Sequence, residues 1–267
     1  MPVGDCQRAF GAVAESDGLE LGPSRVPWIN QRGHFGLPSG CSDAIRTLAA
    51  IFAALDGDPE AQSTKRITPL TGDFVDLRTG TLIEVDESQH FTSFRATTLG
   101  LYPAEAPLGF HRDHYLGLCR ELAPRSDRYR ASNDAAGFGS GGRQRQRAYH
   151  DALRDLAAPA CGRPPVIRVA VLDGDGAGAY RRDRDRIRHL LEDAKAETGA
   201  ERDGTVPPLA AAVSELKTLL AEFDRVRPSD MDERFYNHAY NDLDLAGRTI
   251  IDAFDRERDT GEDLRHK

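Results

Sequence analysis

The sequence predicts a mixed α/β fold with a helical extension toward its C-terminal end. An acidic hairpin over residues 71–90 and an apolar run over 164–172 predict strands of one sheet. Apolar residues at helical spacing dominate the segments between them and the last third of the chain. With 267 residues, the chain is long enough to bury a core without disulfides or a structural metal.

The elements before the hairpin follow from local patterns. Residues 5–15 predict a short helix capped by Asp5, and residues 22–41, rich in Gly, Pro and Ser, predict a loop. Residues 42–55 predict an amphipathic helix, since Ile45, Leu48 and Phe52 recur at helical spacing. Gly57 is suited to end that helix, and residues 56–66 predict a polar loop.

The hairpin and the elements after it complete the expected core. Arg78, Thr79 and Gly80 predict a three-residue turn with glycine where positive φ is needed. Helices are expected over 91–102, 111–122 and 143–156, with an irregular segment over 124–142. The nearly continuous apolar run over 164–172 is typical of a central strand.

The character of the chain changes near residue 200, where we expect a domain boundary. Residues 1–200 predict an α/β core with a basic insertion at about 103–150. Residues 201–267 predict an acidic helical extension, with helices over 179–197, 207–224 and 229–257 around and beyond the boundary. Apolar residues in this extension could pack against a partner, which would be either another protein or a second copy of the chain.

Charge is segregated along the chain. The formal net charge is −8, which at first argues against a nucleic-acid binder. Residues 230–263 hold eleven acids and four arginines, a local charge of −7. Residues 125–150 hold six arginines and two aspartates, a local charge of +4. The net charge therefore does not exclude a nucleic-acid substrate.

Several classes of protein are excluded by simpler features. No apolar run approaches the roughly 20 residues that span a bilayer, and the N-terminus has no secretory pattern. We therefore expect a cytoplasmic protein without a membrane partner. The four cysteines, Cys6, Cys41, Cys119 and Cys161, form no C-x-x-C pair and predict buried free thiols rather than a zinc site.

Three carboxylates of the hairpin are the candidate site. Residues two apart on a strand share a face, so Glu84 and Asp86 point the same way. With the three-residue turn, Asp76 lies one diagonal step from Glu84 on that face. A two-residue turn would shift the register and put Asp73 there in place of Asp76, and the sequence leaves this alternative open.

Crowded carboxylates predict a bound cation, because like charges repel unless something neutralises them. Oxygen ligands of this kind select Mg²⁺ or Mn²⁺. A divalent ion so held can polarise a phosphodiester and make an attacking water easier to deprotonate. The hairpin therefore predicts a metal site formed by Asp76, Glu84 and Asp86, with phosphodiester hydrolysis as its chemistry.

This hairpin resembles a known superfamily. Asp76, the run Leu82-Ile83-Glu84-Val85-Asp86-Glu87-Ser88-Gln89-His90, and then Arg95 and Leu99 resemble the PD-(D/E)XK nucleases, most closely the Vsr-like (very-short-patch-repair-like) branch. Val166-Ile-Arg-Val169 resembles a later strand of that branch. The resemblance covers residues 70–102 well and 143–172 loosely. Two departures are Glu87, where the branch usually has Gly, and the insertion over 103–142.

The resemblance implies a restriction-endonuclease-like core and a role for each matching residue. Asp76 and Glu84 would be metal ligands, and Asp86 stands where the superfamily usually has lysine. His90 would be the catalytic histidine of the Vsr-like branch, and Arg95 a phosphate or scaffold contact. DNA would be the partner, in restriction, repair or defence.

The arginines of the basic segment are candidate nucleic-acid contacts. Arg143, Arg145 and Arg147 begin a predicted helix, where basic residues oppose the helix dipole and so suggest another role. Tyr129, Phe138 and Tyr149 lie among the arginines and are candidates for stacking on bases. Together with the arginines they would form one binding segment.

The sequence leaves three functions open. One is a metal-dependent endonuclease-like hydrolase that cleaves DNA. Another is a catalytically inactive nucleic-acid-binding or scaffold protein on the same fold, which the absence of a lysine after Glu84 supports. The third is a metal-dependent enzyme that acts on a small phosphorylated or nucleotide substrate.

Overall fold

The computed structural model describes residues 4–205, 209–223, 243, 246–247, 249–251 and 253–254. The chain divides into two units, Met1–Ala194 and Lys195–Lys267, and each is described by itself. The division lies close to the boundary expected near residue 200. The sheet, both groups of core residues and the candidate site belong to the first unit.

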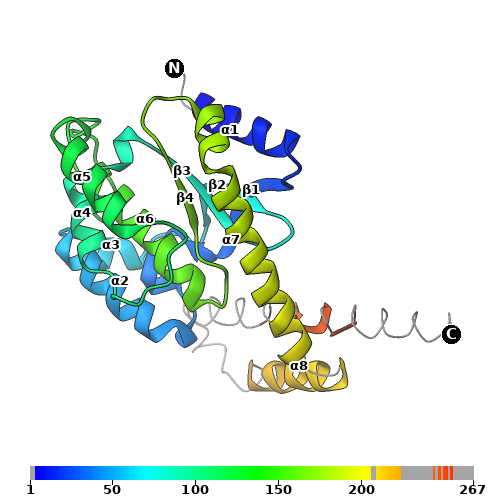
Figure 1. Ribbon diagram of the computed structural model, residues 1–267. Helices are drawn as coiled ribbons and strands as arrows, with labels where there is room; N and C mark the ends of the chain where they lie inside the picture. Colours follow the sequence, from blue (N-terminus) through cyan, green and yellow to red (C-terminus); the bar gives the residue numbers. More distant parts are fainter. Residues whose placement is uncertain are drawn as a thin grey trace. The chain divides into compact units, whose positions relative to one another are not determined.

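A mixed sheet forms the centre of the first unit (Figure 1). In the described part of the chain its order is β1 (Leu21–Asn30), β2 (Pro69–Asp76), β3 (Leu82–Glu87) and β4 (Ile167–Val171). The pairs β1–β2 and β2–β3 are antiparallel, whereas β3 and β4 run parallel. Helices cover both faces, so the predicted mixed α/β class is confirmed.

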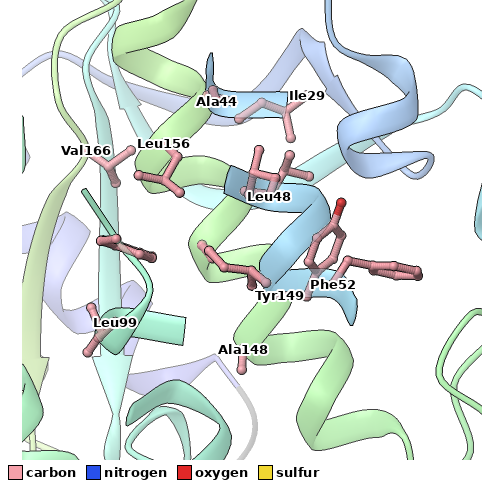
Figure 2. Packing of buried hydrophobic residues seen from close by; sticks show 14 of the residues in the cluster. Ile29, Ala44, Leu48, Phe52, Leu99, Ala148, Tyr149, Leu156 and Val166 are labelled. Atoms are coloured by element: carbon pink, nitrogen blue, oxygen red, sulfur yellow. The ribbon is translucent and has the colours of Figure 1, made fainter. Parts of the chain in front are cut away.

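The larger core lies between the sheet and four helices. These are α2 (Ser42–Ala54), α4 (Ser93–Gly100), α5 (Arg112–Ser126) and α6 (Arg143–Ala160). Leu48 and Phe52 of α2 pack with Tyr149 of α6 in this core, as Figure 2 shows. The predicted helices over 42–55, 111–122 and 143–156 are confirmed, with ends shifted by a few residues.

The opposite face of the sheet carries a smaller core. Phe10 of α1 (Asp5–Ser16) and Tyr180 of α7 (Gly176–Thr205) pack edge to face there, beside Ile83 and Val85 of β3. Ile83 and Val85 thus point away from Glu84 and Asp86, as strand alternation predicts. Asp5 is the first residue of α1 rather than its cap, which is Gly4.

Short elements complete the described chain. They are α3 (Pro59–Ser63), within the segment expected to be a loop, and the 3-10 turns η1 (Gly33–Gly36), η2 (Ser39–Cys41) and η3 (Ser88–His90). The second unit contains α8 (Leu209–Phe223). Most of the helix expected over 229–257, and of the acidic segment, lies outside the described residues. Within the described part, no helix has the length and apolar character needed to cross a membrane.

The prediction of a loop over residues 22–41 is wrong for the first half of that segment, because β1 forms there. Pro23 and Pro27 argued against a strand, since proline lacks the N–H that a sheet interior needs. The strand avoids this cost by lying at the sheet edge and by breaking its pairing with β2 on both sides of Arg25. Edges and bulges are the places where strands accept proline.

The register expected for the hairpin is also wrong. Phe74 pairs with Ile83 and Val75 with Leu82, so Asp76 faces Thr81 across a four-residue turn over residues 77–80. The Asp76 carboxylate accepts hydrogen bonds from the Thr79 backbone N–H at 2.9 Å and from its hydroxyl at 2.8 Å. Asp76 therefore closes the turn instead of joining the face of Glu84.

Asp76→Ala tests this structural role. The substitution removes two hydrogen bonds to a buried carboxylate, and we expect the free energy of unfolding to fall by about 1–3 kcal/mol. Urea denaturation followed by circular dichroism measures the change. Thr79→Val keeps the backbone N–H bond to Asp76 and removes the hydroxyl, which bonds Asp76 and also contacts the Thr81 hydroxyl at 2.7 Å and the Thr81 N–H at 3.2 Å. An unchanged urea midpoint for Asp76→Ala would contradict the assignment.

Candidate functional site

A polar cavity of about 350 Å³ lies where β2 and β3 face α6. Asp73 comes from β2, Glu84 from β3 and His90 from η3. Helix α6 contributes polar residues three or four positions apart, which is the spacing of one helix face. These are Arg143, Gln146, Arg147, His150, Asp151 and Arg154. The cavity thus collects acids, histidines and arginines from segments distant in the sequence.

Asp73 and Glu84 form an acidic pair at the wall of this cavity. Continuing the observed pairing places Asp73 directly opposite Glu84 on adjacent strands. The Asp73 backbone N–H lies 3.3 Å from Glu84 Oε1, and Asp73 Oδ2 accepts from the Val85 N–H at 2.8 Å. Gly72 leaves the space that Glu84 fills, since a Cβ there would stand 2.1 Å from Glu84 Oε1.

Burial disfavours the ionised forms of both carboxylates in the acidic pair. Burial, and then the nearby Glu84 carboxylate, raise the pKa of Asp73 to about 7. Burial also raises the pKa of Glu84, although Arg154 and Arg168 oppose that shift. Arg154 Nε lies 3.4 Å from Glu84 Oε1 and is the cation nearest to the pair. Such a pair fits a divalent cation, which would favour both ionised carboxylates.

A second group behind the pair could also hold a metal ion. Asp86, His90 and Asp151 each offer one ligand atom, and the three atoms lie within 4.8 Å of one another. His90 Nδ1 lies 3.2 Å from Asp86 Oδ1 and 3.3 Å from Asp151 Oδ2. Burial lowers the pKa of His90, but the two carboxylates outweigh it and the net shift is upward. A metal here therefore competes with a proton on Nδ1.

Asp86 is held by Arg168, which is buried in the centre of the unit. Arg168 Nη1 lies 3.0 Å from Asp86 Oδ1, and its Nε donates to Asp155 Oδ1 at 2.6 Å. Tyr115 donates its hydroxyl to Asp86 Oδ2 at 3.2 Å. Arg168 also lies 3.5 Å from Asp151. This network fixes the two aspartates on either side of His90.

His150 and Asp151 are site residues that the sequence did not single out. Burial, followed by the charge of Arg154, lowers the pKa of His150 to about 3, so its ring is neutral at physiological pH. Its Nε2 is buried without a hydrogen-bond partner. Arg154 was missed as well, although the polar positions of α6 recur three or four residues apart and could have revealed a functional helix face.

The predicted arginines divide into two kinds. Arg143 and Arg147 line the cavity and give it a basic rim. Arg145 instead lies 3.2 Å from Asp56 and donates to the Phe138 carbonyl at 2.7 Å, so it holds a loop in place. Arg95 is buried and donates to Asp155 at 2.6 Å. Arg95 is therefore the scaffold contact that the resemblance also allowed, and not a phosphate contact. The expectation that Arg145 binds nucleic acid is corrected, because its guanidinium group is engaged by Asp56 and the Phe138 carbonyl.

The aromatic candidates for base stacking are reduced to one. Phe138 and Tyr149 are buried in the larger core and cannot reach a ligand. Tyr129 is 38% exposed, with the Arg130 and Arg147 guanidinium carbons 5.2 and 5.8 Å from its ring centroid. Arg147 thus contacts the cavity on one side and Tyr129 on the other.

The predicted acidic site is corrected at one position. Asp73, the alternative that the sequence left open, faces Glu84, whereas Asp76 closes the turn. Glu84 and His90 line the cavity as expected, and Asp86 lies behind it in the group with His90 and Asp151. The length of the hairpin turn determined which aspartate faces Glu84. The local sequence did not reveal that the Asp76 side chain would form hydrogen bonds within that turn.

Comparison with known proteins places the chain in a family. Residues 50–192 match a family of unknown function, DUF7255. The chain belongs to this family. No curated protein and no solved structure matches the chain. The DUF7255 segment contains every residue that lines the cavity except Gln31, and it contains Asp86 and Arg168 as well.

Asp73→Asn tests the electrostatics of the acidic pair. The folded-state pKa of Asp73 lies near 7, above its ordinary value of 3.8, so folded protein holds a proton that unfolded chain releases between these limits. Stability is therefore lost as pH rises toward 7 in metal-free protein. The variant removes this loss, and we expect its Tm to exceed that of the native protein by about 3 °C or more at pH 8.

Differential scanning calorimetry in EDTA at pH 4 and pH 8 measures this effect. At pH 4 the two proteins should melt together, since Asp73 is protonated in folded protein there. Asp76→Asn is the matched control, because it changes a carboxylate of the same hairpin outside the pair. A Tm for Asp73→Asn at or below the native value at pH 8 would show that the pair is not strained by its charge.

Proposed function

We propose that this DUF7255 protein is a metal-dependent nuclease that hydrolyses phosphodiester bonds of DNA. The observation that supports it best is the composition of one cavity. The acidic pair, Asp73 and Glu84, shares that cavity with the basic rim of Arg143 and Arg147. The resemblance of the β3 segment to the Vsr-like nucleases supports the same proposal, with Asp73 in the role first expected of Asp76.

Asp73 and Glu84 would hold the cation, and Mg²⁺ or Mn²⁺ suits their oxygen ligands. When bound, such an ion supplies Lewis acidity toward a phosphodiester and eases deprotonation of an attacking water. Arg154, close to Glu84, supplies the fixed positive charge that the superfamily usually takes from a lysine. The second group, Asp86, His90 and Asp151, offers an alternative position for the ion.

The two histidines of the cavity are suited to opposite parts of proton transfer. With Nδ1 held between the Asp86 and Asp151 carboxylates, the raised pKa of His90 favours the doubly protonated ring, whose other proton, on Nε2, suits donation to a leaving oxygen. His150 stays neutral, and its unpartnered Nε2 can accept a hydrogen bond from water or ligate a metal. His90 would thus act as the acid toward the leaving oxygen.

Arg143 and Arg147 would bind the phosphates of the substrate. Burial lowers the pKa of Arg147, and Arg143 and Arg130 add to that shift by repulsion. An anion between these guanidinium groups relieves the repulsion. Tyr129, next to Arg147, can stack on a base of the same strand, since stacking tolerates any base sequence.

A second function is favoured by one specific observation. The cavity of about 350 Å³ falls within the range of small-molecule sites, which suits a mononucleotide or another small phosphorylated substrate. Binding of nucleic acid without cleavage is the other alternative, because Arg168 and the His90 proton already neutralise Asp86 and Asp151. Each alternative predicts a distinct result in the assay below.

The test compares cleavage by the native protein and two variants of the acidic pair. Plasmid DNA and a labelled single-stranded oligonucleotide are incubated with Mg²⁺, Mn²⁺ or EDTA, and products are resolved on gels. We expect cleavage with either metal, none in EDTA, and a loss of at least about 100-fold in Glu84→Gln and Asp73→Asn. Asp76→Asn is the control and should cleave at a rate close to that of the native protein if it folds.

The other outcomes separate the alternatives. Oligonucleotide binding in EDTA, measured by fluorescence anisotropy, without cleavage in any metal favours an inactive binding protein. Hydrolysis of nucleotides or of bis(p-nitrophenyl) phosphate, without cleavage of DNA, favours the small substrate. Cleavage that persists in EDTA or in Glu84→Gln would refute the proposed metal site.

A further inference from the structure

Two of the four cysteines meet at the ends of two helices, outside the cavity. Cys41 ends η2 and caps the N-terminus of α2, and Cys161 caps the C-terminus of α6. Their sulfur atoms lie 3.1 Å apart although 120 residues separate them in the sequence. The fold therefore brings together two thiols that no sequence pattern pairs.

The contact is made by packed elements rather than by loose loops. Turn η2 and helix α2 both pack against α6. Cys41 is buried and its sulfur also lies 3.3 Å from the Ala160 carbonyl oxygen. Cys161 is partly exposed. Cys41 is thus enclosed, and solvent reaches the sulfur pair on the side of Cys161.

The distance is within reach of a covalent bond. A disulfide has an S–S length of about 2.05 Å, so closing the gap needs a shift of about one ångström. Small rotations of two side chains provide such a shift. Gly162, which follows Cys161, has a φ of +65° and no atom within 4 Å of the position that a Cβ would take.

The two thiols also differ in acidity. The hydrogen bond from the Cys161 thiol favours negative charge on Cys41 and lowers the pKa of Cys41. The same contact, together with burial, raises the pKa of Cys161. Because thiolates rather than thiols are the nucleophiles of cysteine chemistry, Cys41 is the sulfur suited to react first.

We propose that Cys41 and Cys161 form a redox-active dithiol that peroxides oxidise to an intramolecular disulfide. The Cys41 thiolate attacks one oxygen of hydrogen peroxide, the O–O bond breaks, and the departing hydroxide takes a proton to become water. The resulting sulfenic acid is then attacked by the Cys161 sulfur. Its hydroxyl leaves with the Cys161 proton as a second water, and peroxide has gained the two electrons that the sulfurs lost.

The remaining cysteines are internal controls. Burial raises the pKa of Cys6 and of Cys119 to about 11, which keeps both thiols protonated at neutral pH. No sulfur lies near either of them among the residues that the structure describes. Oxidation should therefore select one pair out of four thiols. Disulfides of this kind in intracellular proteins are usually redox-sensing rather than structural.

The disulfide would have a mechanical consequence. It would tie the start of α2 to the end of α6 and close a loop of 120 residues in the unfolded chain. Cross-links that close long loops restrict the unfolded state and so stabilise the folded one. The oxidised protein should therefore melt at a higher temperature than the reduced protein, and a thiol reductant should reverse the shift.

The experiment oxidises purified full-length protein with a small excess of hydrogen peroxide. Intact mass spectrometry should show the loss of two hydrogen atoms, and peptide mapping should find Cys41 linked to Cys161. Dithiothreitol should restore both the mass and the Tm. Cys6→Ser should behave like the native protein, whereas Cys161→Ser should lose the product and the Tm shift.

Three results would overturn the proposal. They are four alkylatable thiols remaining after peroxide, a link that involves Cys6 or Cys119, and a reversible Tm rise that persists in Cys161→Ser. None of these readouts depends on metal binding or on cleavage of DNA. The dithiol and the proposed nuclease activity therefore stand or fall separately.

Discussion

The buried guanidinium group of Arg168 holds the first unit together. It reaches from β4 to Asp86 on β3 and to Asp151 and Asp155 on α6. Arg95 and the Tyr102 hydroxyl contact Asp155 as well, which joins α4 to the same network. Buried charges are costly when a partner is missing, so this network disfavours arrangements of α6 that would separate Asp151 and Asp155 from Arg168. That arrangement carries Asp151 and Arg154 into the cavity beside the acidic pair.

The sequence predicted features that depend on neighbouring residues. Periodicity located the helices, and strand alternation correctly separated Ile83 and Val85 from Glu84 and Asp86. Prediction from the sequence failed where a side chain closes a turn, as Asp76 does. It also failed where β1 accommodates prolines at the sheet edge. It could not reveal the Arg168 network, because Arg168 and Asp86 are 82 residues apart and no local pattern encodes their contact. The composition of the site depends on contacts that only the folded chain makes. This is why the choice of Asp73 over Asp76 as the partner of Glu84 could not be settled from the sequence.

Charge segregation within the first unit is compatible with the proposed polyanionic substrate, although the chain as a whole is acidic. The net charge of −8 is a sum over the sequence, whereas a phosphate at the cavity meets Arg143 and Arg147. Asp73 and Glu84 lie on the strands, where the proposed cation would bind. Under the proposed function, β2 and β3 would thus hold the metal and α6 the phosphate.

The central claim is that Asp73 and Glu84 hold a divalent cation, and anomalous diffraction from crystals grown with Mn²⁺ at pH 8 tests it directly. The account predicts a manganese peak within about 2.0–2.6 Å of carboxylate oxygens of both residues, the usual range for such ligands. Crystals of Asp73→Asn should lack the peak. A peak at Asp76, one confined to Asp86, His90 and Asp151, or none at saturating Mn²⁺ would contradict the claim.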